Sequence, residues 1–498
     1  MWPDICLLVI LAVPLAAAAA LAICRQALIR AAGGIAVAAV VIALLAAVVL
    51  APGVSEGRFP GLTLAPDPMP HVELRLRLDW VSLPFLFTEI VVTLMAVVYA
   101  LGYHHRDTST PFFYALLLLF GVGMSGTTLA DDTVLFYTFW ELMLVASAAL
   151  ILVWGDERPE GPSRQTVALK YAIFTHIGSL LVLVALLVLF DSVGYDSFSK
   201  LREGVTLPPR LASTLIALFL LGFGVKMAVF PLHAWLPDAH TVAPMPVTIM
   251  LAAAMLSMGV YGILRFPMGL FDYASISAFA VPMMVIGVVS EIYGALMALA
   301  ERDIKRIIAY SSVSQMGYIL FGLGTMNADG IVGGTLHVIY HAIVKALLFA
   351  VVGIVIYGTQ RRRLDDLGGL GRALPLVTAC AVVGVLAIAG MPPLAIFDSE
   401  WMIFAGGFHT GRTGLAVASL FGSLLTVVYA LYFGGRLFLG ELPDSLGTTA
   451  GQTVIRPPLA MILPTVFLAV LTIVAGLFPG PVVAWISHEL SALFGGIG

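Results

Sequence analysis

The chain has 498 residues, of which 60% are hydrophobic and 11% are charged, and its formal net charge is −4. A soluble domain is about one-quarter charged, so this composition excludes a water-soluble globular protein. Apolar runs of roughly 20 residues recur along the whole chain, and a run of that length crosses a bilayer as a helix. The sequence therefore predicts an all-α polytopic membrane protein, and it gives no indication of a nucleic-acid partner.

About fourteen transmembrane helices are expected. The predicted spans lie near 4–24, 31–51, 82–102, 112–129, 133–154, 166–191, 211–230, 243–265, 277–299, 307–324, 331–357, 373–408 with a break inside it, 414–438 and 457–479. The first span has no basic segment ahead of it, so it is predicted to be a retained helix and not a cleaved signal peptide. The polar connection between Pro52 and Asp79 alternates in VELRLRLDW, which favours a short strand or hairpin on the membrane surface.

The basic residues of the predicted loops favour a chain with both termini outside. In that orientation the inside loops hold fourteen arginine and lysine residues and the outside loops hold eight. Cytoplasmic loops of membrane proteins carry such an excess. We expect an integral protein of a prokaryotic cytoplasmic membrane.

Two groups of five spans share one arrangement. The first begins near residue 112, has an early acid, Glu141, and has a fourth helix broken at Pro231. The second begins near residue 277, and its fourth helix is broken at Pro392 and Pro393. Because the offset between the groups is five helices, the second group is expected to be inverted in the membrane.

Four units follow from this division, with helices 7 and 12 broken. They are N-terminal helices 1–3 with a surface loop, a first five-helix repeat (helices 4–8), an inverted second repeat (helices 9–13), and a C-terminal loop with helix 14. Their predicted bounds are 1–110, 111–270, 271–440 and 441–498.

Two residues near the first break form a candidate site. Glu141 lies in VLFYTFWELMLV and Lys226 in GFGVKMAVFPLH, and ionisable residues inside a bilayer mark hydrated ion paths. A lysine whose proton affinity depends on the distance to a carboxylate is suited to gating proton transfer. The alternatives are a neutral, hydrogen-bonded Glu141 and a Lys226 whose amine extends to the membrane surface.

His337, His341 and Lys345 form a stripe on one helix face, because they stand at i, i+4 and i+8 in TLHVIYHAIVKALLF. Histidine titrates near neutral pH, so this stripe is suited to relaying protons through water. A zinc site is disfavoured, because no acid follows the first histidine and lysine is not a zinc ligand. Structural hydrogen bonding is the alternative.

Glu400 follows the second break in GMPPLAIFDSEWMIF, with Asp398 beside it. A carboxylate near freed backbone groups is a candidate site of proton release or uptake. The alternative is that Asp398 caps the half-helix after the break, with Glu400 in its first turn.

Other polar residues are weaker candidates. His233, Asp238 and His240 in PLHAWLPDAH are candidates for proton access, with backbone hydrogen bonding by Asp238 as the alternative. His176 is expected to be a buried structural histidine, and Lys170 to extend toward the membrane surface. The charge runs ERDIKR and QRRRLDD are expected to anchor inner helix ends.

No cofactor or metal is expected in this chain. Cys6, Cys24 and Cys380 lie in or at the ends of apolar spans, and their spacing matches no metal, haem or iron–sulfur pattern. No glycine-rich nucleotide motif follows a predicted strand. Redox chemistry, where it is coupled to this chain, is expected in another subunit.

Five motifs resemble those of the antiporter-like membrane subunits of respiratory complex I, and most closely the M-type subunit (mitochondrial subunit 4). They are FYTFWELMLV, GVKMAVFPLHAWLPDAHTVAPMPV, DIKRIIAYSSVSQMGY, HVIYHAIVKALLF and GMPPLAIFDSEWMIF, and the resemblance covers nearly the whole chain. Large subunits of group 4 membrane hydrogenases and of multisubunit cation/proton antiporters are related. The resemblance implies fourteen helices, two inverted repeats and a hydrophilic axis through the bilayer.

The resemblance also implies roles for single residues. Glu141 and Lys226 match a glutamate–lysine pair of helices 5 and 7. Lys345 matches a central lysine of helix 11, and Glu400 matches the terminal acid of helix 12 in M-type subunits.

This chain departs from the M-type pattern at three places. Ser257 stands where a helix-8 lysine is expected, and Gln315 replaces a helix-10 histidine. The HxxxHxxxK stripe is closer to the L-type pattern. These departures leave open which complex the chain belongs to.

Together these features predict a proton-translocating, antiporter-like subunit of a complex I-type redox machine. In outline, the resemblance implies that the Glu141–Lys226 distance gates a proton, which passes by water, Ser257 and Gln315 to the histidine stripe and leaves near Glu400. The spacing of these residues is consistent with that order. The enzymatic role is that of a proton-pumping subunit of an NADH:quinone oxidoreductase-like translocase without a redox centre of its own. The expected partners are the lipid bilayer and other membrane subunits, including further antiporter-like subunits.

Two alternatives stay open. One is a subunit of a group 4 membrane hydrogenase-type complex, or of a multisubunit Na⁺/H⁺ antiporter without redox coupling. The oxygen atoms of Asp398 and Glu400 at a break would suit Na⁺. The other is a passive scaffold with an inactive channel, which Ser257 favours and the buried ionisable residues oppose.

Overall fold

The computed structural model describes residues 2–69, 72–103, 107–157, 161–194, 197–201, 207–443 and 454–493. Three arginines that were counted for the orientation, Arg106, Arg158 and Arg202, lie outside the described residues.

The described chain is almost wholly helical. Its elements are α1 (Trp2–Ile23), α2 (Arg25–Leu28), α3 (Ala32–Ser55), β1 (Gly61–Met69), β2 (Val72–Arg77), α4 (Ser82–Tyr103), α5 (Thr110–Leu129), α6 (Thr133–Trp154), α7 (Arg164–Val193), α8 (Phe198–Leu201), α9 (Pro209–Met227), α10 (Leu236–Val242), α11 (Met245–Met250), the π-helix η1 (Leu251–Met255), α12 (Leu256–Arg265), α13 (Pro267–Leu270), α14 (Tyr273–Ser277), α15 (Ala280–Ala300), α16 (Ile304–Gly324), α17 (Ala328–Thr359), the 3₁₀ turn η2 (Leu364–Asp366), α18 (Leu370–Ala373), α19 (Pro375–Ile388), α20 (Ala395–His409), α21 (Thr413–Phe438), α22 (Leu459–Leu477) and α23 (Gly480–Leu493).

Within the described residues, 13 helical segments are long and apolar enough to cross a membrane. They are α1, α3, α4, α5, α6, α7, α9, the run from α11 to α13, α15, α16, α17, α21 and α22. The pair α19 and α20 supplies the remaining predicted span, on the two sides of the Pro392–Pro393 bond. Every predicted span is confirmed as helix, because an apolar segment in lipid satisfies its backbone groups only within itself.

One helix end and one additional helix differ from the prediction. α9 ends at Met227 and not near residue 230, because Ala228 adopts a left-handed conformation with φ +57°. α23 was not predicted, since the C-terminal unit was expected to hold helix 14 alone. It forms because Ile486 is buried and the Trp485 ring packs edge-on against Trp80, with centroids 6.0 Å apart.

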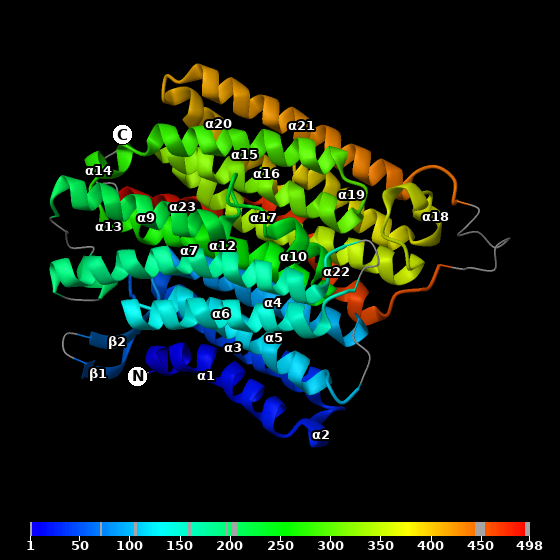
Figure 1. Ribbon diagram of the computed structural model, residues 1–498, viewed down its shortest axis with the longest axis horizontal. Coiled ribbons are helices and arrows are strands. Elements are labelled where there is room, and N and C mark those ends of the chain that lie inside the picture. Colours follow the sequence, from blue (N-terminus) through cyan, green and yellow to red (C-terminus); the bar gives the residue numbers. More distant parts are fainter. Residues whose placement is uncertain are drawn as a thin grey trace.

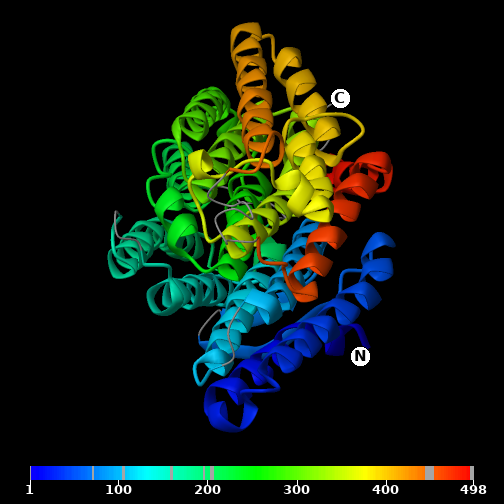
Figure 2. The same ribbon diagram turned by 90° about the vertical axis from the view of Figure 1, so that its right-hand side faces the viewer.

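The helices run roughly side by side, with α1 and α3 at one edge of the bundle and α21 at the opposite edge (Figure 1). The view turned by 90° shows the same two edges at the bottom and top of the bundle (Figure 2). α16, α17 and the run from α11 to α13 are almost wholly buried, whereas α1, α3, α21 and α22 are buried over a minor part of their length. Polar side chains on the buried helices can therefore meet away from lipid.

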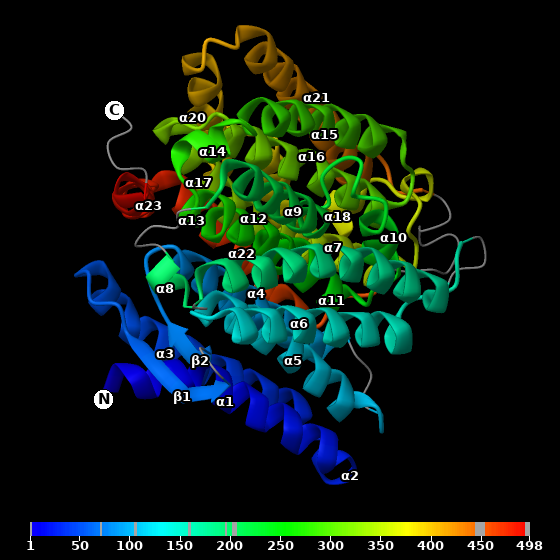
Figure 3. The same ribbon diagram turned by 60° about the vertical axis from the view of Figure 1, so that its left-hand side comes forward.

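β1 and β2 form an antiparallel hairpin, with Gly61 opposite Arg77. The hairpin lies beside α1 and α3 (Figure 3), which confirms the strand predicted from VELRLRLDW. Asp79, two residues after the hairpin, makes a bidentate pair with Arg265, with Oδ2–Nη1 and Oδ1–Nη2 distances of 2.6 and 3.1 Å. Arg265 is one of the eight basic residues that the predicted orientation assigns to outside loops, and in the structure it is the buried last residue of α12.

The two predicted repeats show the same order of helix contacts. α5 packs on α6, α6 on α7, α7 on α9, and α9 on α12. Likewise α15 packs on α16, α16 on α17, α17 on α19 and α20, and α20 on α21. In each repeat the broken helix is the fourth: α9 and α10 form it in the first repeat, and α19 and α20 form it in the second. The inversion of the second set and the unit bounds stay predictions.

Candidate functional site

The first break places Lys226 near the end of α9, and the backbone groups of the break have partners. The Phe230 amide donates to the Ser290 hydroxyl at 3.0 Å. The Trp235 indole N–H donates to the carbonyl of Val225 at 3.0 Å. The break is therefore a defined structural element and not a frayed helix end.

Lys226 is buried, and its Nζ lies 5.1 Å from the centroid of the Trp140 indole ring. That distance is within the range of a cation–π interaction. Trp140 directly precedes Glu141 on α6, and the Glu141 carboxylate interacts electrostatically with Lys226. The structure thus brings the predicted pair into electrostatic reach across two helices.

Glu141 has a direct partner that the sequence did not identify. Its Oε2 lies 3.2 Å from His176 Nδ1 on α7, and the His176 side chain is 51% exposed. The expectation of a buried structural histidine is wrong, because this face of α7 lies at the outside of the bundle. No local pattern pairs residues 35 positions apart on different helices.

The second break places Glu400 against Gly390. Gly390 has φ +65°, and a Cβ at this position would collide with Glu400 Oε2. The same oxygen lies 3.5 Å from the Ser423 hydroxyl, and Oε1 has no hydrogen-bond partner among the described residues. A glycine is therefore needed here both for the left-handed turn and for the approach of the carboxylate.

Asp398 does not cap the half-helix after the break, so that alternative is wrong. The N-cap residue of α20 is Leu394, and Asp398 lies inside the first turn. The helix already resumes at Ala395, two residues after Pro393, so Asp398 lies beyond the capping position.

The α17 stripe is fully buried. His337 bridges two helices, with Nε2 2.9 Å from Gln315 Oε1 on α16 and Nδ1 3.1 Å from the Ser399 hydroxyl on α20. Lys345 donates to the Ile308 carbonyl at 3.0 Å and to the Ser311 hydroxyl. Two of the three stripe residues are therefore tied to α16, and one also reaches the residue next to Glu400.

His341 and His240 are the other histidines of this region. Within the described chain neither ring nitrogen of either residue has a hydrogen-bond partner, and both side chains are fully buried. His240 interacts electrostatically with His341 and with Lys345. α10, which follows the first break, therefore brings a fourth polar residue to the α17 stripe.

Ser257 is buried at the start of α12, directly after the π-helical turn η1. Its hydroxyl donates to the carbonyl of Ala253 in the preceding turn at 2.8 Å. π-Helical turns are frequent at functional sites. Ser257 stands where a lysine was expected, and its hydroxyl is bonded within its own helix.

His233 and Asp238 lie between the break and the bundle end. The His233 ring is buried, with its centroid 4.8 Å from that of Tyr293. Asp238 accepts from Lys170 Nζ and Arg306 Nη1, each at 2.7 Å. The alternative that Asp238 bonds freed backbone groups is therefore wrong, and Lys170, whose side chain is 36% exposed, pairs with it.

The two charge runs form ion pairs between elements, which goes beyond the expected anchoring. Lys305 Nζ lies 3.5 Å from an Asp156 oxygen and donates to the Ala243 carbonyl at 2.7 Å. Arg362 lies 3.2 Å from Asp156 and 3.4 Å from Asp303. These contacts join segments of both predicted repeats at one end of the bundle.

Two further buried acids were missed. Glu291 on α15 accepts from the Ser419 hydroxyl at 2.9 Å, and Glu89 on α4 accepts from the Thr128 hydroxyl at 3.0 Å. Each has one oxygen without a partner among the described residues. The signal was present, since a lone acid within an apolar span is the pattern that identified Glu141.

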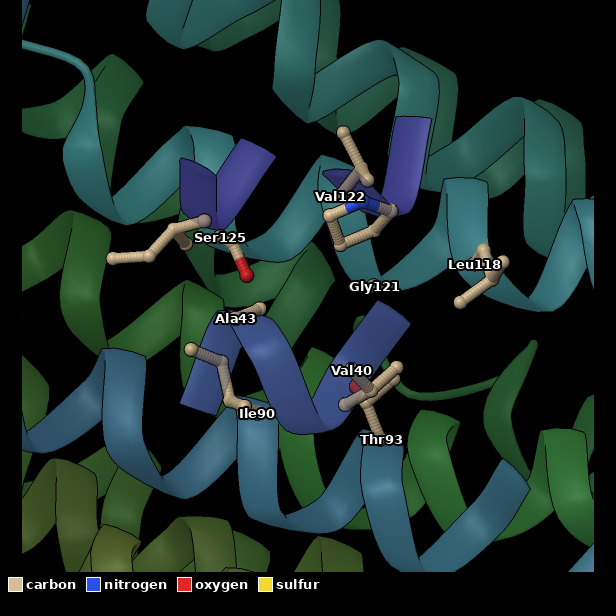
Figure 4. A pocket seen from close by; sticks show the side chains of 10 residues that line it. Val40, Ala43, Ile90, Thr93, Leu118, Gly121, Val122 and Ser125 are labelled. Carbon is tan, nitrogen blue, oxygen red and sulfur yellow. The ribbon is translucent and has the colours of Figure 1, made fainter. Parts of the chain in front are cut away.

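A cavity of about 20 Å³ lies between α1, α3, α4 and α5. Figure 4 shows Thr93 and Ser125 among its otherwise apolar lining. Thr93 lies one helical turn after Glu89. Since the lining includes no residue of α17 or α20, this polar spot is separate from the α17 stripe.

Residues 130–426 match the family model described as NADH:quinone oxidoreductase/Mrp antiporter, TM. The NAD(P)H-quinone oxidoreductase chain 4 1 of Synechococcus sp. (strain JA-3-3Ab) is 35% identical over 378 residues, which cover 74% of this chain and 70% of the relative. The matched segment holds both breaks and the α17 stripe, whereas Glu89 precedes it.

The fold is similar to chains of three solved complexes. The Mrp complex from Dietzia sp. DQ12-45-1b gives a TM-score of 0.87 at 24% identity, over 98% of both chains. The membrane-bound sulfane sulfur reductase, an archaeal respiratory membrane complex, gives 0.84 at 29% identity, over 96% of this chain and 77% of that chain. Respiratory complex I from Thermus thermophilus gives 0.84 at 23% identity, over 99% and 100%.

Proposed function

This chain belongs to the NADH:quinone oxidoreductase/Mrp antiporter transmembrane family, and we propose that it carries protons through the membrane as a subunit of a redox-driven, complex I-type assembly. The observation that carries the proposal is a series of buried ionisable side chains that begins at one helix break and ends at the other. Such residues are rare in membrane spans and accompany proton paths. The assembly would supply the redox centres and the other membrane subunits.

The first part of the path is a gate. Lys226 lies on Trp140 and within electrostatic reach of Glu141. A short Glu141–Lys226 distance favours the protonated amine, and a longer one favours release of its proton. Because Lys226 stands at the end of α9, beside the break, a small movement of the break changes this distance.

The second part is the central relay. The released proton passes by water, with Ser257 and Gln315 as polar neighbours, to His240, His341 and Lys345. The interaction of His240 with His341 and Lys345 supports this link between the two predicted repeats. A histidine nitrogen can accept a proton from one neighbour and return it to another, which suits these side chains to a relay.

The third part is the release site. His337 contacts Ser399, and Ser399 directly precedes Glu400 at the second break. Proton release would occur from Glu400, with Asp398 nearby in the same helix turn. His233 and Asp238 remain candidates for access, although the two ion pairs of Asp238 favour a structural role.

The similarity to the sulfane sulfur reductase chain supports a redox-driven complex, and the similarity to the cyanobacterial relative supports NAD(P)H:quinone chemistry in that complex. A group 4 membrane hydrogenase-type complex is the alternative with redox coupling. A multisubunit Na⁺/H⁺ antiporter is the alternative without it. We place the chain in a prokaryotic cytoplasmic membrane, with both termini outside.

The test is proton transport by the purified parent complex in sealed liposomes with a pH-sensitive dye. We expect transport that needs the redox substrate and is unchanged by sodium. Lys226→Ala and Lys345→Ala should abolish it in assembled complexes, whereas Lys200→Ala, at a half-exposed lysine beside Glu73, should not. Transport that needs a sodium gradient and no redox substrate would favour the antiporter. Full transport in both lysine variants would mean that this chain is a passive scaffold with an inactive channel.

A further inference from the structure

Glu291 is a buried carboxylate that the proposed path does not use. Its Oε1 accepts from the Ser419 hydroxyl at 2.9 Å. Its Oε2 lies against Gly422, where a Cβ would approach to 2.8 Å, and has no hydrogen-bond partner among the described residues. A fully buried carboxylate with one unpaired oxygen is unfavourable unless it holds a proton or another cation.

One face of α21 links Glu291 to Glu400. Three hydroxyl residues stand on it at i, i+4 and i+7, namely Ser419, Ser423 and Thr426. Ser419 bonds Glu291, and Ser423 lies 3.5 Å from Glu400 Oε2. Thr426 continues the stripe, with its hydroxyl 3.1 Å from the Tyr318 hydroxyl on α16. The rest of this helix is largely apolar, so the hydroxyl stripe marks a polar path between the two acids.

The charge of Glu400 bears on Glu291, and both acids bear on Tyr318, which contacts Thr426 of the same stripe. The polar groups that act on the two carboxylates are the two serine hydroxyls and, for Glu291, the other acid. Because Ser419 and Ser423 stand one helical turn apart on α21, the two carboxylates lie near neighbouring turns of one buried face. A negative charge on one of them disfavours a negative charge on the other.

We propose that Glu291 and Glu400 form a carboxylate pair that binds one transferable proton, and that Glu291 receives the proton which leaves Glu400. The step moves a proton from the Glu400 carboxylic acid to the Glu291 carboxylate, so the pair keeps one negative charge throughout. The proton would then leave at the α15–α21 face, and not directly at the second break. The inference rests on the proposed function, because the pair receives its proton from that path.

The test compares Glu291→Gln with Glu89→Gln in the whole parent complex in liposomes. The two acids are a matched pair: both are buried, both accept one hydroxyl, and both have one oxygen without a partner among the described residues. Removing a positioned proton-transfer group slows the transfer by about 10²-fold or more. We expect at least a roughly tenfold lower proton transport rate in Glu291→Gln, and a wild-type rate in Glu89→Gln.

Infrared difference spectra provide a readout that a merely structural role would not change. The carboxylic C=O band of the protonated pair should disappear or shift in Glu291→Gln and should shift in Ser419→Ala. Ser419→Ala keeps the Glu291 carboxylate and removes only the hydrogen bond from Ser419. This variant therefore provides the test if Glu291→Gln prevents assembly. Wild-type transport and an unchanged band in either variant would overturn the proposal. A defect that appears only in the presence of sodium would overturn the assignment to protons.

Glu400→Gln separates this inference from the proposed function. If Glu400→Gln and Lys345→Ala lose transport while Glu291→Gln keeps it, only the carboxylate pair is wrong. If all three variants transport at the wild-type rate, the proposed path itself is wrong.

Discussion

His176 Nδ1 lies 3.2 Å from Glu141 Oε2, so the acid that faces Lys226 also contacts a half-exposed histidine on the outer face of α7. Glu141 therefore has two basic neighbours, one buried and one near the bundle surface. A positive charge on His176 would compete with Lys226 for the same carboxylate. The gate would then depend on the His176 contact as well as on movement of the break.

Replacing His176 by alanine should slow proton transport several-fold while the complex stays folded. The His176 side chain is half-exposed on the outer face of α7, so its removal leaves no cavity in the core and the melting temperature should change little. His409→Ala is the control, because His409 makes a similar exposed pair with Asp329 at 3.0 Å. Equal transport in both variants would mean that the His176 contact does not take part in gating.

Ser311→Ala should lower proton transport more than Ser312→Ala. Ser311 accepts a hydrogen bond from Lys345, whereas the Ser312 hydroxyl contacts the carbonyl of Ile308 in its own helix at 3.4 Å. Loss of a hydrogen bond that leaves a buried amine under-satisfied costs about 1–3 kcal/mol. Transport rates of the two assembled variants give the comparison, and a larger defect in Ser312→Ala would contradict it.

Gly390→Ala should impair both stability and transport, because the new Cβ collides with Glu400 and the backbone is left-handed. Gly411→Ala is matched in backbone conformation, with φ +72°, but its Cβ meets open space. The conformational strain alone is about 1–2 kcal/mol and is common to both variants. A transport defect confined to Gly390→Ala would therefore report displacement of the carboxylate. The same transport rate in both variants would show that Glu400 tolerates the shift.

Asp79→Asn should destabilise the protein by about 3–5 kcal/mol, because it leaves the buried Arg265 guanidinium without its bidentate partner. Glu73→Gln, in the adjacent hairpin, removes a more exposed acid 3.5 Å from Arg75 and should cost at most about 1 kcal/mol. Thermal unfolding of the purified complex, followed by loss of subunit assembly, measures both. Similar unfolding temperatures for the two variants would contradict this ranking.

The sequence by itself determined the helices and their two breaks. Each apolar run became a helix because lipid offers no hydrogen bonds, and the prolines at each break interrupt a ladder of backbone bonds because proline has no N–H. It also identified Glu141, Lys226, the α17 stripe and Glu400, because an ionisable residue stands out in an apolar span. The same rule would have identified Glu89 and Glu291, had it been applied to every span.

Only the tertiary structure decided which of these residues meet. His176 meets Glu141, His337 meets Gln315, and Ser419 meets Glu291 through the rotation and neighbour order of the helices. A helix that is apolar on nearly every side carries little periodic signal about which face turns inward. Partners that lie on different helices are therefore set by how the helices pack together, and no pattern within one span determines them.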